Sequence, residues 1–214
     1  MPHNLDLQRA MMVILALMIA IPIHEFAHAL SAVNNGDDGP RRDGRLSIMP
    51  WDHFDPMGAI FTVVSAVWGI GLGWGKPVMV NPQYLHNPRW GMCKVAAWGP
   101  FSNFLLAILF AVPLRFGWVT GDSSASMGEL FLICVEINLG LMLFNLIPIG
   151  PLDGAKIVVA FLPESQAYSF SRFMEQWGFM LLFALLFMGG PILAVMVLIP
   201  REIIMRLLIG PALG

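Results

Sequence analysis

Five consecutive residues near the start of the chain, His24-Glu25-Phe26-Ala27-His28, carry the pattern HExxH. On a helix, positions four apart lie on one face, so both imidazoles can reach a single metal ion. Zinc accepts such nitrogen ligands, and a catalytic zinc site keeps one position for water. Glu25 is then placed to take the proton of a zinc-activated water that attacks a carbonyl group. The motif therefore predicts metal-assisted hydrolysis, with His24 and His28 as ligands and Glu25 as the base.

The setting of this motif argues against a chance match. The residues before it, 11–23, include no charged side chain. An ionisable residue at bilayer depth costs roughly 2.5–3.5 kcal/mol on insertion scales. Three of them on one turn of an apolar segment therefore indicate a functional site.

A zinc site with two histidines needs a further protein ligand, and Asp153 is our candidate. It follows the run Asn145-Leu146-Ile147-Pro148-Ile149-Gly150-Pro151-Leu152. The two prolines predict that the preceding helix ends here, and a carboxylate at such an end supplies the oxygen of a His-His-carboxylate site. The alternative is an ordinary helix-ending turn with a solvated aspartate.

Composition indicates that these residues belong to an integral membrane protein. Of 214 residues, 57% are hydrophobic and 12% are charged, about half of the roughly 25% charged residues of a soluble domain. The mean hydropathy is +0.71. The net charge of −2 provides no basic surface for nucleic acid. Cys93 and Cys134 fall in or beside apolar runs, and we interpret both as small buried side chains.

Five apolar segments must position the motif residues. About 20 helical residues span the roughly 30 Å hydrocarbon core, so four of the five predict spanning helices. The other, 57–75, either crosses or re-enters. The stretch 76–89 contains three prolines and is expected to be extended, while 156–176 is expected to hold an interfacial amphipathic helix. The five segments are approximately residues 7–33, 57–75, 91–116, 128–152 and 177–199.

The predicted fold is an all-α polytopic membrane protein with four or five transmembrane helices. A short extended or re-entrant element is expected between the second and third apolar segments. We expect one transmembrane domain over residues 1–214, with a catalytic core at about 7–155. Its C-terminal part, 156–214, would hold the amphipathic stretch and the last transmembrane helix. The first segment is expected to remain in the protein as a helix, because signal-peptide cleavage near Ala29 would cut through the HExxH motif.

Several motifs together resemble one family. HExxH stands in an early apolar segment, and Asn-x-x-Pro and Leu-Asp-Gly follow much later. This order resembles the site-2 protease family of intramembrane zinc metalloproteases, in particular its short bacterial and archaeal branch. The resemblance covers roughly residues 20–155, and Gly150 departs from it, because relatives often have proline there. Further similar tracts are Gly44-Arg45-Leu46-Ser47, Pro50, His53, Asp55-Pro56, Gly58, Gly73-Trp74-Gly75-Lys76-Pro77-Val78, Asn81-Pro82 and Gly99-Pro100-Phe101-Ser102-Asn103.

The resemblance implies a function and a role for each motif residue. His24, His28 and Asp153 would bind one Zn²⁺ per chain, Glu25 would be the base, and Asn145 would bind or polarise the substrate near the scissile bond. The substrate would be a membrane-embedded or membrane-adjacent segment of another protein, and no nucleotide or nucleic acid would be involved. We expect a multi-pass protein of the plasma membrane, in contact with the lipid bilayer, with its active site nearer the cytoplasmic side.

Other polar and extended residues allow weaker interpretations. Val78, Met79 and Val80 are expected to pair with a locally unwound substrate as an added strand. Asn103 and Asn138 either bond neighbouring helices or line the active cavity. We interpret His53, near Asp55, as a solvated loop residue and not a second metal site. The sequence does not explain why Glu136 stands in an apolar segment.

Two other classes of protein fit parts of the sequence. A non-catalytic membrane protein that binds zinc would not need Glu25. A metal transporter also carries intramembrane histidine and aspartate, but repeated halves or paired broken helices are then expected, and we find one break, near Pro148. Glu25→Gln separates the classes, because it should abolish proteolysis while zinc binding or transport survives.

Overall fold

The computed structural model describes residues 7–53, 55–56, 58, 75–119 and 125–210. Within these ranges the regular structure is helical, and no β-strand is present. This agrees with the predicted all-α class. The expected second apolar segment, 57–75, lies outside the described residues except at its positions 58 and 75, as does the choice between crossing and re-entry.

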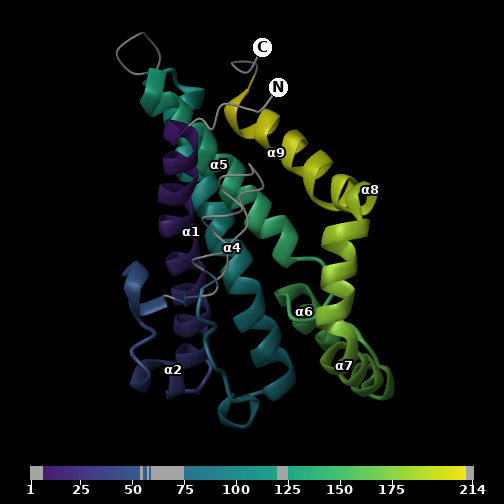
Figure 1. Cartoon of the computed structure of the whole chain (residues 1–214). Coiled ribbons are helices and arrows are strands. Elements are labelled where there is room, and N and C mark those ends of the chain that lie inside the picture. The colour runs from purple at the N-terminus through teal and green to yellow at the C-terminus, as the bar shows by residue number, and fades with distance from the viewer. Residues whose placement is uncertain (1–6, 54, 57, 59–74, 120–124, 211–214) are drawn as a thin grey trace.

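Three long helices form the central bundle (Figure 1): α1 (Leu7–Asn34), α4 (Pro88–Arg115) and α5 (Ala125–Asn145). Each is long and apolar enough to cross a membrane, as predicted for the first, third and fourth apolar segments. α1 and α5 run in one direction and α4 runs back between them. The second half of α1 and the first half of α4 therefore lie at the same end of the bundle.

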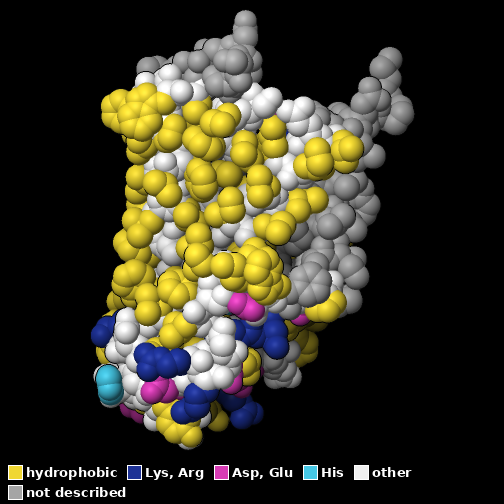
Figure 2. Space-filling view, turned by 90° about the vertical axis from the view of Figure 1, so that its left-hand side faces the viewer, with side chains coloured by type: hydrophobic (Ala, Val, Ile, Leu, Met, Phe, Trp, Pro, Cys, Tyr) yellow, Lys and Arg dark blue, Asp and Glu magenta, His cyan; other side chains and the backbone are white. Residues whose placement is uncertain are grey.

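Small residues let these helices approach closely. Ala16 and Ala20 of α1 and Ala107 of α4 are fully buried, and helices in membranes associate through such small side chains. Large apolar side chains point outward instead. Figure 2 shows hydrophobic side chains spread over much of the face that it draws, with charged side chains gathered at one end. That distribution is the one expected of a bundle surrounded by lipid.

The helix break expected near Pro148 is present. α5 ends at Asn145, and a turn that contains Pro148 and Pro151 leads to α6 (Asp153–Phe161). Ile147 and Leu152 of this turn are buried. These two side chains anchor the turn in the protein, while Pro148 and Pro151 are exposed.

The prediction of one continuous helix over 177–199 is wrong. The chain forms α7 (Glu164–Met188), the short α8 (Gly190–Leu193), a π-helical turn η3 (Ala194–Leu198) and α9 (Ile199–Ile209). The chain bends by 91° between two arms, α7 and the helical run from Gly190 to Ile209. The bend falls where Gly189 and Gly190, poor helix formers, precede Pro191, which has no N–H to donate.

The connections near the site contain short helical turns: α2 (Gly39–Arg42), η1 (Pro50–His53) and η2 (Pro82–Tyr84). Of the stretch 76–89 predicted to be extended, residues 76–81 have no helical structure and form no paired strand. The rest of the prediction is wrong, because η2 and the start of α4 at Pro88 lie within it. The prediction that His53 is a solvated loop residue is wrong. His53 is 2% exposed, and its Nε2 donates to the Ser47 carbonyl over 2.7 Å. Glu136 lies 3.9 Å from the guanidinium of Arg9, which gives it a partner.

Candidate metal centre

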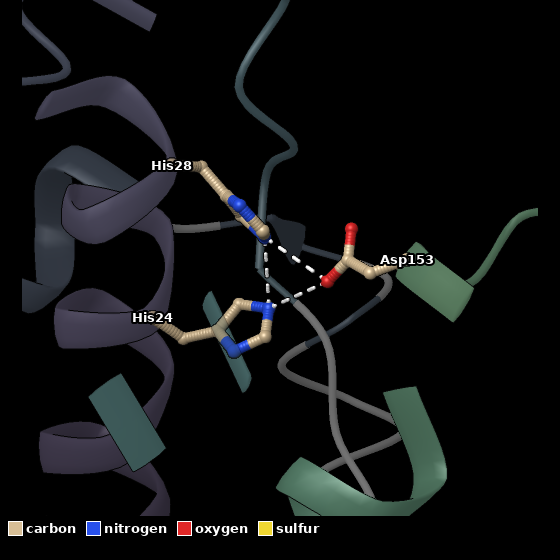
Figure 3. Close-up of side chains that lie close together, drawn as sticks. All are labelled: His24, His28 and Asp153. Carbon is tan, nitrogen blue, oxygen red and sulfur yellow. Dashed lines mark hydrogen bonds and ion pairs between the residues drawn. The ribbon is translucent and has the colours of Figure 1, made fainter. Parts of the chain in front are cut away.

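The HExxH motif lies on one continuous helix, α1. His24 and His28 point from the same face of α1 toward α6 (Figure 3), and they are 7% and 8% exposed. Their rings meet edge to face, with centroids 4.6 Å apart. The four-residue spacing therefore brings both imidazoles to one point.

Asp153 reaches the same point from the first turn of α6. It is 5% exposed, and its carboxylate lies at the positive end of the α6 dipole. Gly154 explains how α6 can begin here: a Cβ at Gly154 would lie 2.3 Å from the Leu146 carbonyl oxygen and 2.4 Å from that of Ile147. Only a residue without a side chain permits this approach of α6 to the end of α5.

Three donor atoms converge from these elements. The Nε2 atoms of His24 and His28 lie 3.0 Å apart. Oδ2 of Asp153 lies 3.3 Å from the first and 3.1 Å from the second, as the dashed lines in Figure 3 show. These are the three residues that the sequence predicted as metal ligands, drawn together from positions 24, 28 and 153.

The outer nitrogens of both rings are engaged elsewhere. Nδ1 of His28 lies 2.7 Å from the Val95 carbonyl oxygen, which can only accept. Nδ1 of His24 lies 2.6 Å from Oδ1 of Asn103. With a proton on each Nδ1, neutral rings direct the lone pairs of both Nε2 atoms toward the carboxylate. Two lone pairs and an anion repel one another, so this arrangement calls for a cation between them.

The spacing of the three donors fits zinc. Bonds of about 2.0–2.2 Å in a tetrahedron place neighbouring ligand atoms about 3.3–3.5 Å apart. The observed separations of 3.0, 3.1 and 3.3 Å lie close to these edges. Two imidazoles and one carboxylate are also a donor set typical of catalytic zinc, which keeps a further position for water.

The space around the rings depends on α4. A Cβ at Gly99 would lie 2.5 Å from Nε2 of His28 and 2.7 Å from Cε1 of His24. Gly99 and Asn103 are four residues apart, so they share the face of α4 that meets both histidines. A side chain at position 99 would therefore enter the donor group itself.

Asp153 has a second charged neighbour. Its Oδ1 lies 3.4 Å from Nζ of Lys156, one turn further along α6. Burial raises the pKa of the Asp153 carboxyl, but an adjacent positive charge, such as a protonated His28 or His24 ring, outweighs burial and holds the pKa below its usual range. The carboxylate is therefore ionised, as a metal ligand must be.

Glu25 lies beside this centre and has a backbone partner. Its Oε2 accepts a hydrogen bond from the N–H of Val78 over 3.2 Å. Gly75 packs near the same side chain, because a Cβ there would lie 3.8 Å from Cγ of Glu25. The predicted base is thus covered by the non-helical segment 75–81.

The other predicted site residues, Asn145 and Val78 to Val80, differ in their contacts and exposure. Asn145 is the last residue of α5, and its side chain donates to the Leu141 carbonyl over 3.0 Å, within its own helix. Met79 is 73% exposed, whereas Val78 and Val80 are partly covered. The substrate roles of these four residues stay predictions.

Sequence reasoning left Asn103 between two roles and missed three other contacts of the centre, those of Gly99, Val95 and Val78. The spacing of Gly99 and Asn103 offered a signal, because residues four apart on a helix face one neighbour. The carbonyl of Val95 and the N–H of Val78 offered none, since every residue except proline carries the same backbone groups.

Comparison with known proteins agrees with the geometry. The family model described as "Peptidase family M50" matches residues 116–189, which contain Asn145 and Asp153. A Bacillus subtilis (strain 168) protein named "Putative zinc metalloprotease YwhC" is 33% identical over 202 residues, which are 91% of this chain and 89% of that protein. No solved structure matches the chain.

Mycobacterial relatives are similar over a shorter range. A Mycolicibacterium smegmatis protein named "Putative zinc metalloprotease Rip2" is 29% identical over 178 residues, 82% of this chain and 66% of that protein. A Mycobacterium tuberculosis (H37Rv) protein of the same name is 30% identical over 158 residues, 72% and 59% of the two chains. The chain belongs to peptidase family M50, as the resemblance to site-2 proteases predicted. It is a membrane metalloprotease.

Proposed function

We propose that this chain is a zinc endopeptidase that cuts peptide bonds in or near the transmembrane segments of other membrane proteins. The observation that carries the proposal is the approach of two imidazole nitrogens and one carboxylate oxygen within a bundle of apolar helices. The relatives' names support zinc as the metal. One ion per chain agrees with the one group of three such donors found among the described residues.

The residues of the centre then have distinct tasks. His24, His28 and Asp153 would hold the ion, and bound zinc would supply a Lewis acid that polarises the peptide carbonyl and acidifies water. Glu25 takes a proton from water as the water oxygen bonds to the peptide carbon. The same proton then passes to the peptide nitrogen as the C–N bond breaks.

Asn145 would stabilise the charge that develops on the carbonyl oxygen. An amide donor suits this task in a dry site, because hydrogen bonds to a forming oxyanion are strong there. Its amide now donates to Leu141, one turn back. A change of side-chain rotamer would free the N–H groups for a substrate carbonyl.

Segment 75–81 is proposed to hold the substrate chain. A helical substrate protects its carbonyls with its own hydrogen bonds, so it must unwind before hydrolysis. Met79 offers exposed backbone and side chain beside Val78, whose N–H lies on Glu25. A substrate strand paired along residues 78–80 would thus lie next to the base.

The charge distribution supports a location of the centre near the cytoplasmic face of the plasma membrane. α2, with Arg41 and Arg42, and the start of α4, with Arg89, lie at the end of the bundle opposite the start of α1 and the end of α9 (Figure 1). Basic residues gather on cytoplasmic loops. His28 precedes the end of α1 at Asn34 by six residues, about 9 Å of helix, so the centre lies toward this face.

The proposal is tested with purified protein in lipid vesicles. A panel of single-span membrane proteins is incubated with it, with and without a zinc chelator, and products are mapped by mass. We expect cleavage that the chelator stops, that added zinc restores, and that Glu25→Gln abolishes while zinc remains bound. Zinc-dependent transport with no cleavage of any substrate, or full cleavage by the Gln variant, would overturn the proposal.

A further inference from the structure

Two amide side chains lie deep in the bundle beside the metal centre. Asn103 of α4 and Asn138 of α5 are both 0% exposed, the lowest value among the polar side chains of the described residues. Hydrogen bonds between transmembrane helices contribute about 0.6 kcal/mol on average. The hydrogen bond between α4 and α5 is therefore too weak to explain by itself why two amides are buried beside a histidine.

The hydrogen bonds of these amides have a single consistent direction. Nδ2 of Asn138 donates to the carbonyl of Cys134 over 2.8 Å, and that oxygen can only accept. Oδ1 of Asn138 is therefore left to accept from Nδ2 of Asn103, 2.9 Å away. Oδ1 of Asn103 is in turn left to accept, and its partner is Nδ1 of His24 at 2.6 Å.

This direction decides where His24 carries its proton. Because Oδ1 of Asn103 can only accept, the neutral His24 ring has its proton on Nδ1 and its lone pair on Nε2, the atom that faces His28 and Asp153. His28 reaches the same tautomer through a backbone carbonyl, that of Val95. His24 depends instead on the side chain of Asn103, 79 positions away. Nδ2 of Asn103 donates to Asn138 over 2.9 Å and, over a longer 3.4 Å, to the Ala20 carbonyl.

We propose that Asn103, held by Asn138, is a positioning residue for the metal centre that fixes the tautomer and orientation of His24. Metal-bound histidines commonly donate their other ring N–H to such a partner, and its loss typically costs 10- to 100-fold in metal affinity. The inference rests on the proposed zinc site, and it adds that zinc affinity depends on residues that do not touch the ion.

The test compares three variants of the full-length protein in detergent micelles. N103L/N138L removes both partners of the amide–amide bond together, so that neither amide is left buried without the other. The group that loses its partner is Nδ1 of His24, which is the contact under test. N103D keeps an acceptor for Nδ1 of His24 but cannot donate to Asn138. S102A is the matched control, since Ser102 is buried on the same turn of α4 but donates to the Gly99 carbonyl, outside the relay.

Zinc dissociation constants are measured by competition with a chromophoric chelator. We expect N103L/N138L to bind zinc 10- to 100-fold more weakly, and N103D and S102A to stay within about threefold of the wild type. A role in helix packing alone predicts the reverse order: N103D, with a buried charge and a lost bond, would be the worst variant. Wild-type affinity in N103L/N138L would overturn the inference.

A spectroscopic measurement of the His24 tautomer tests the inference even if the double variant folds less well. With histidine rings labelled by ¹⁵N, the metal-free wild type should show the Nδ1–H tautomer for His24, and N103L/N138L should show a mixture. An unchanged tautomer in the double variant also overturns the inference. Failure of the wild type to bind zinc at all would instead defeat the proposed function, so the two failures are distinguishable.

Discussion

The backbone N–H of Val78 donates to Oε2 of Glu25 over 3.2 Å, across 53 positions of sequence. The segment that carries Val78 is fixed on both sides of this bond. The N–H of Lys76 donates to the His53 carbonyl over 2.8 Å, and the N–H of Asn81 donates to the buried carboxylate of Asp37 over 2.7 Å. The direction of the proposed base is thus set by a segment anchored outside the metal centre.

Val78→Pro should separate catalysis from metal binding. Proline removes the N–H that Glu25 accepts, and a hydrogen bond to a charged group contributes about 1.5–3 kcal/mol. We expect kcat to fall about 10- to 100-fold while zinc content stays at one per chain, measured by cleavage of a reconstituted substrate and by metal analysis. Val78→Ala keeps the N–H and should stay near wild-type activity. Equal activity of the Pro and Ala variants would rule out this role of the bond.

Gly99→Ala should destroy the metal centre. The added Cβ would lie 2.4 Å from Cε1 of His28 and 2.7 Å from Cε1 of His24. Neither ring can turn away cheaply, because the Nδ1 atoms are held by Val95 and Asn103. We expect zinc affinity to fall more than 100-fold in chelator competition, with helix content by circular dichroism unchanged.

Gly140→Ala is the matched control for this variant. Gly140 lies within α5, and a Cβ there would meet nothing within 4 Å. Alanine has a higher helix propensity than glycine by about 0.8–1 kcal/mol, so the control should bind zinc normally and melt no lower than the wild type. Normal zinc affinity in Gly99→Ala would show that the histidine pair has room that the structure does not indicate.

The donor residues could be found from the sequence because their chemistry is carried by side-chain type and local spacing. HExxH sets His24 and His28 four apart on a helix, and the prolines before Asp153 predict the turn that α5 and α6 make. Their approach to within hydrogen-bonding distance is a property of the fold. Their role as ligands stays a prediction that zinc binding tests.

The outer contacts could not be found in the same way. Whether Asn103 meets another amide or a histidine depends on how α4 is rotated about its axis, and an apolar helix shows little periodicity that would fix this rotation. The bend after α7 was missed for a different reason. Hydropathy counts Gly189, Gly190 and Pro191 as compatible with a span, although these residues disfavour a continuous helix.

Asp153→Asn and Lys156→Met should differ widely in effect. The amide keeps the size of Asp153 but removes the charge that faces both imidazoles, so we expect zinc affinity to fall at least 100-fold. The Lys156 side chain is 48% exposed and lies 3.4 Å from the other carboxylate oxygen. Pairs exposed to this degree are screened by solvent and contribute little, so Lys156→Met should weaken binding less than threefold. A tenfold loss in Lys156→Met would instead mean that this lysine orients Asp153.

Gly178→Ala should loosen the attachment of α7 to the turn that precedes Asp153. A Cβ at Gly178 would lie 2.4 Å from the carbonyl oxygen of Gly150 and 2.9 Å from its carbon. These are backbone atoms of a packed turn, and overpacking of this kind typically costs about 1–3 kcal/mol. The Gly150 N–H also lies 3.4 Å from the sulfur of Met174 on α7, so the whole contact must move when a side chain enters it.

We expect Gly178→Ala to lower the melting temperature and to weaken zinc binding, because displacement of the turn carries Asp153 with it. Gly190→Ala is the comparison at the start of α8, just after the bend that ends α7, since a Cβ there would meet nothing within 4 Å. It should leave both quantities unchanged. If Gly178→Ala melts lower but binds zinc as tightly as the wild type, α7 stabilises the fold without positioning the carboxylate.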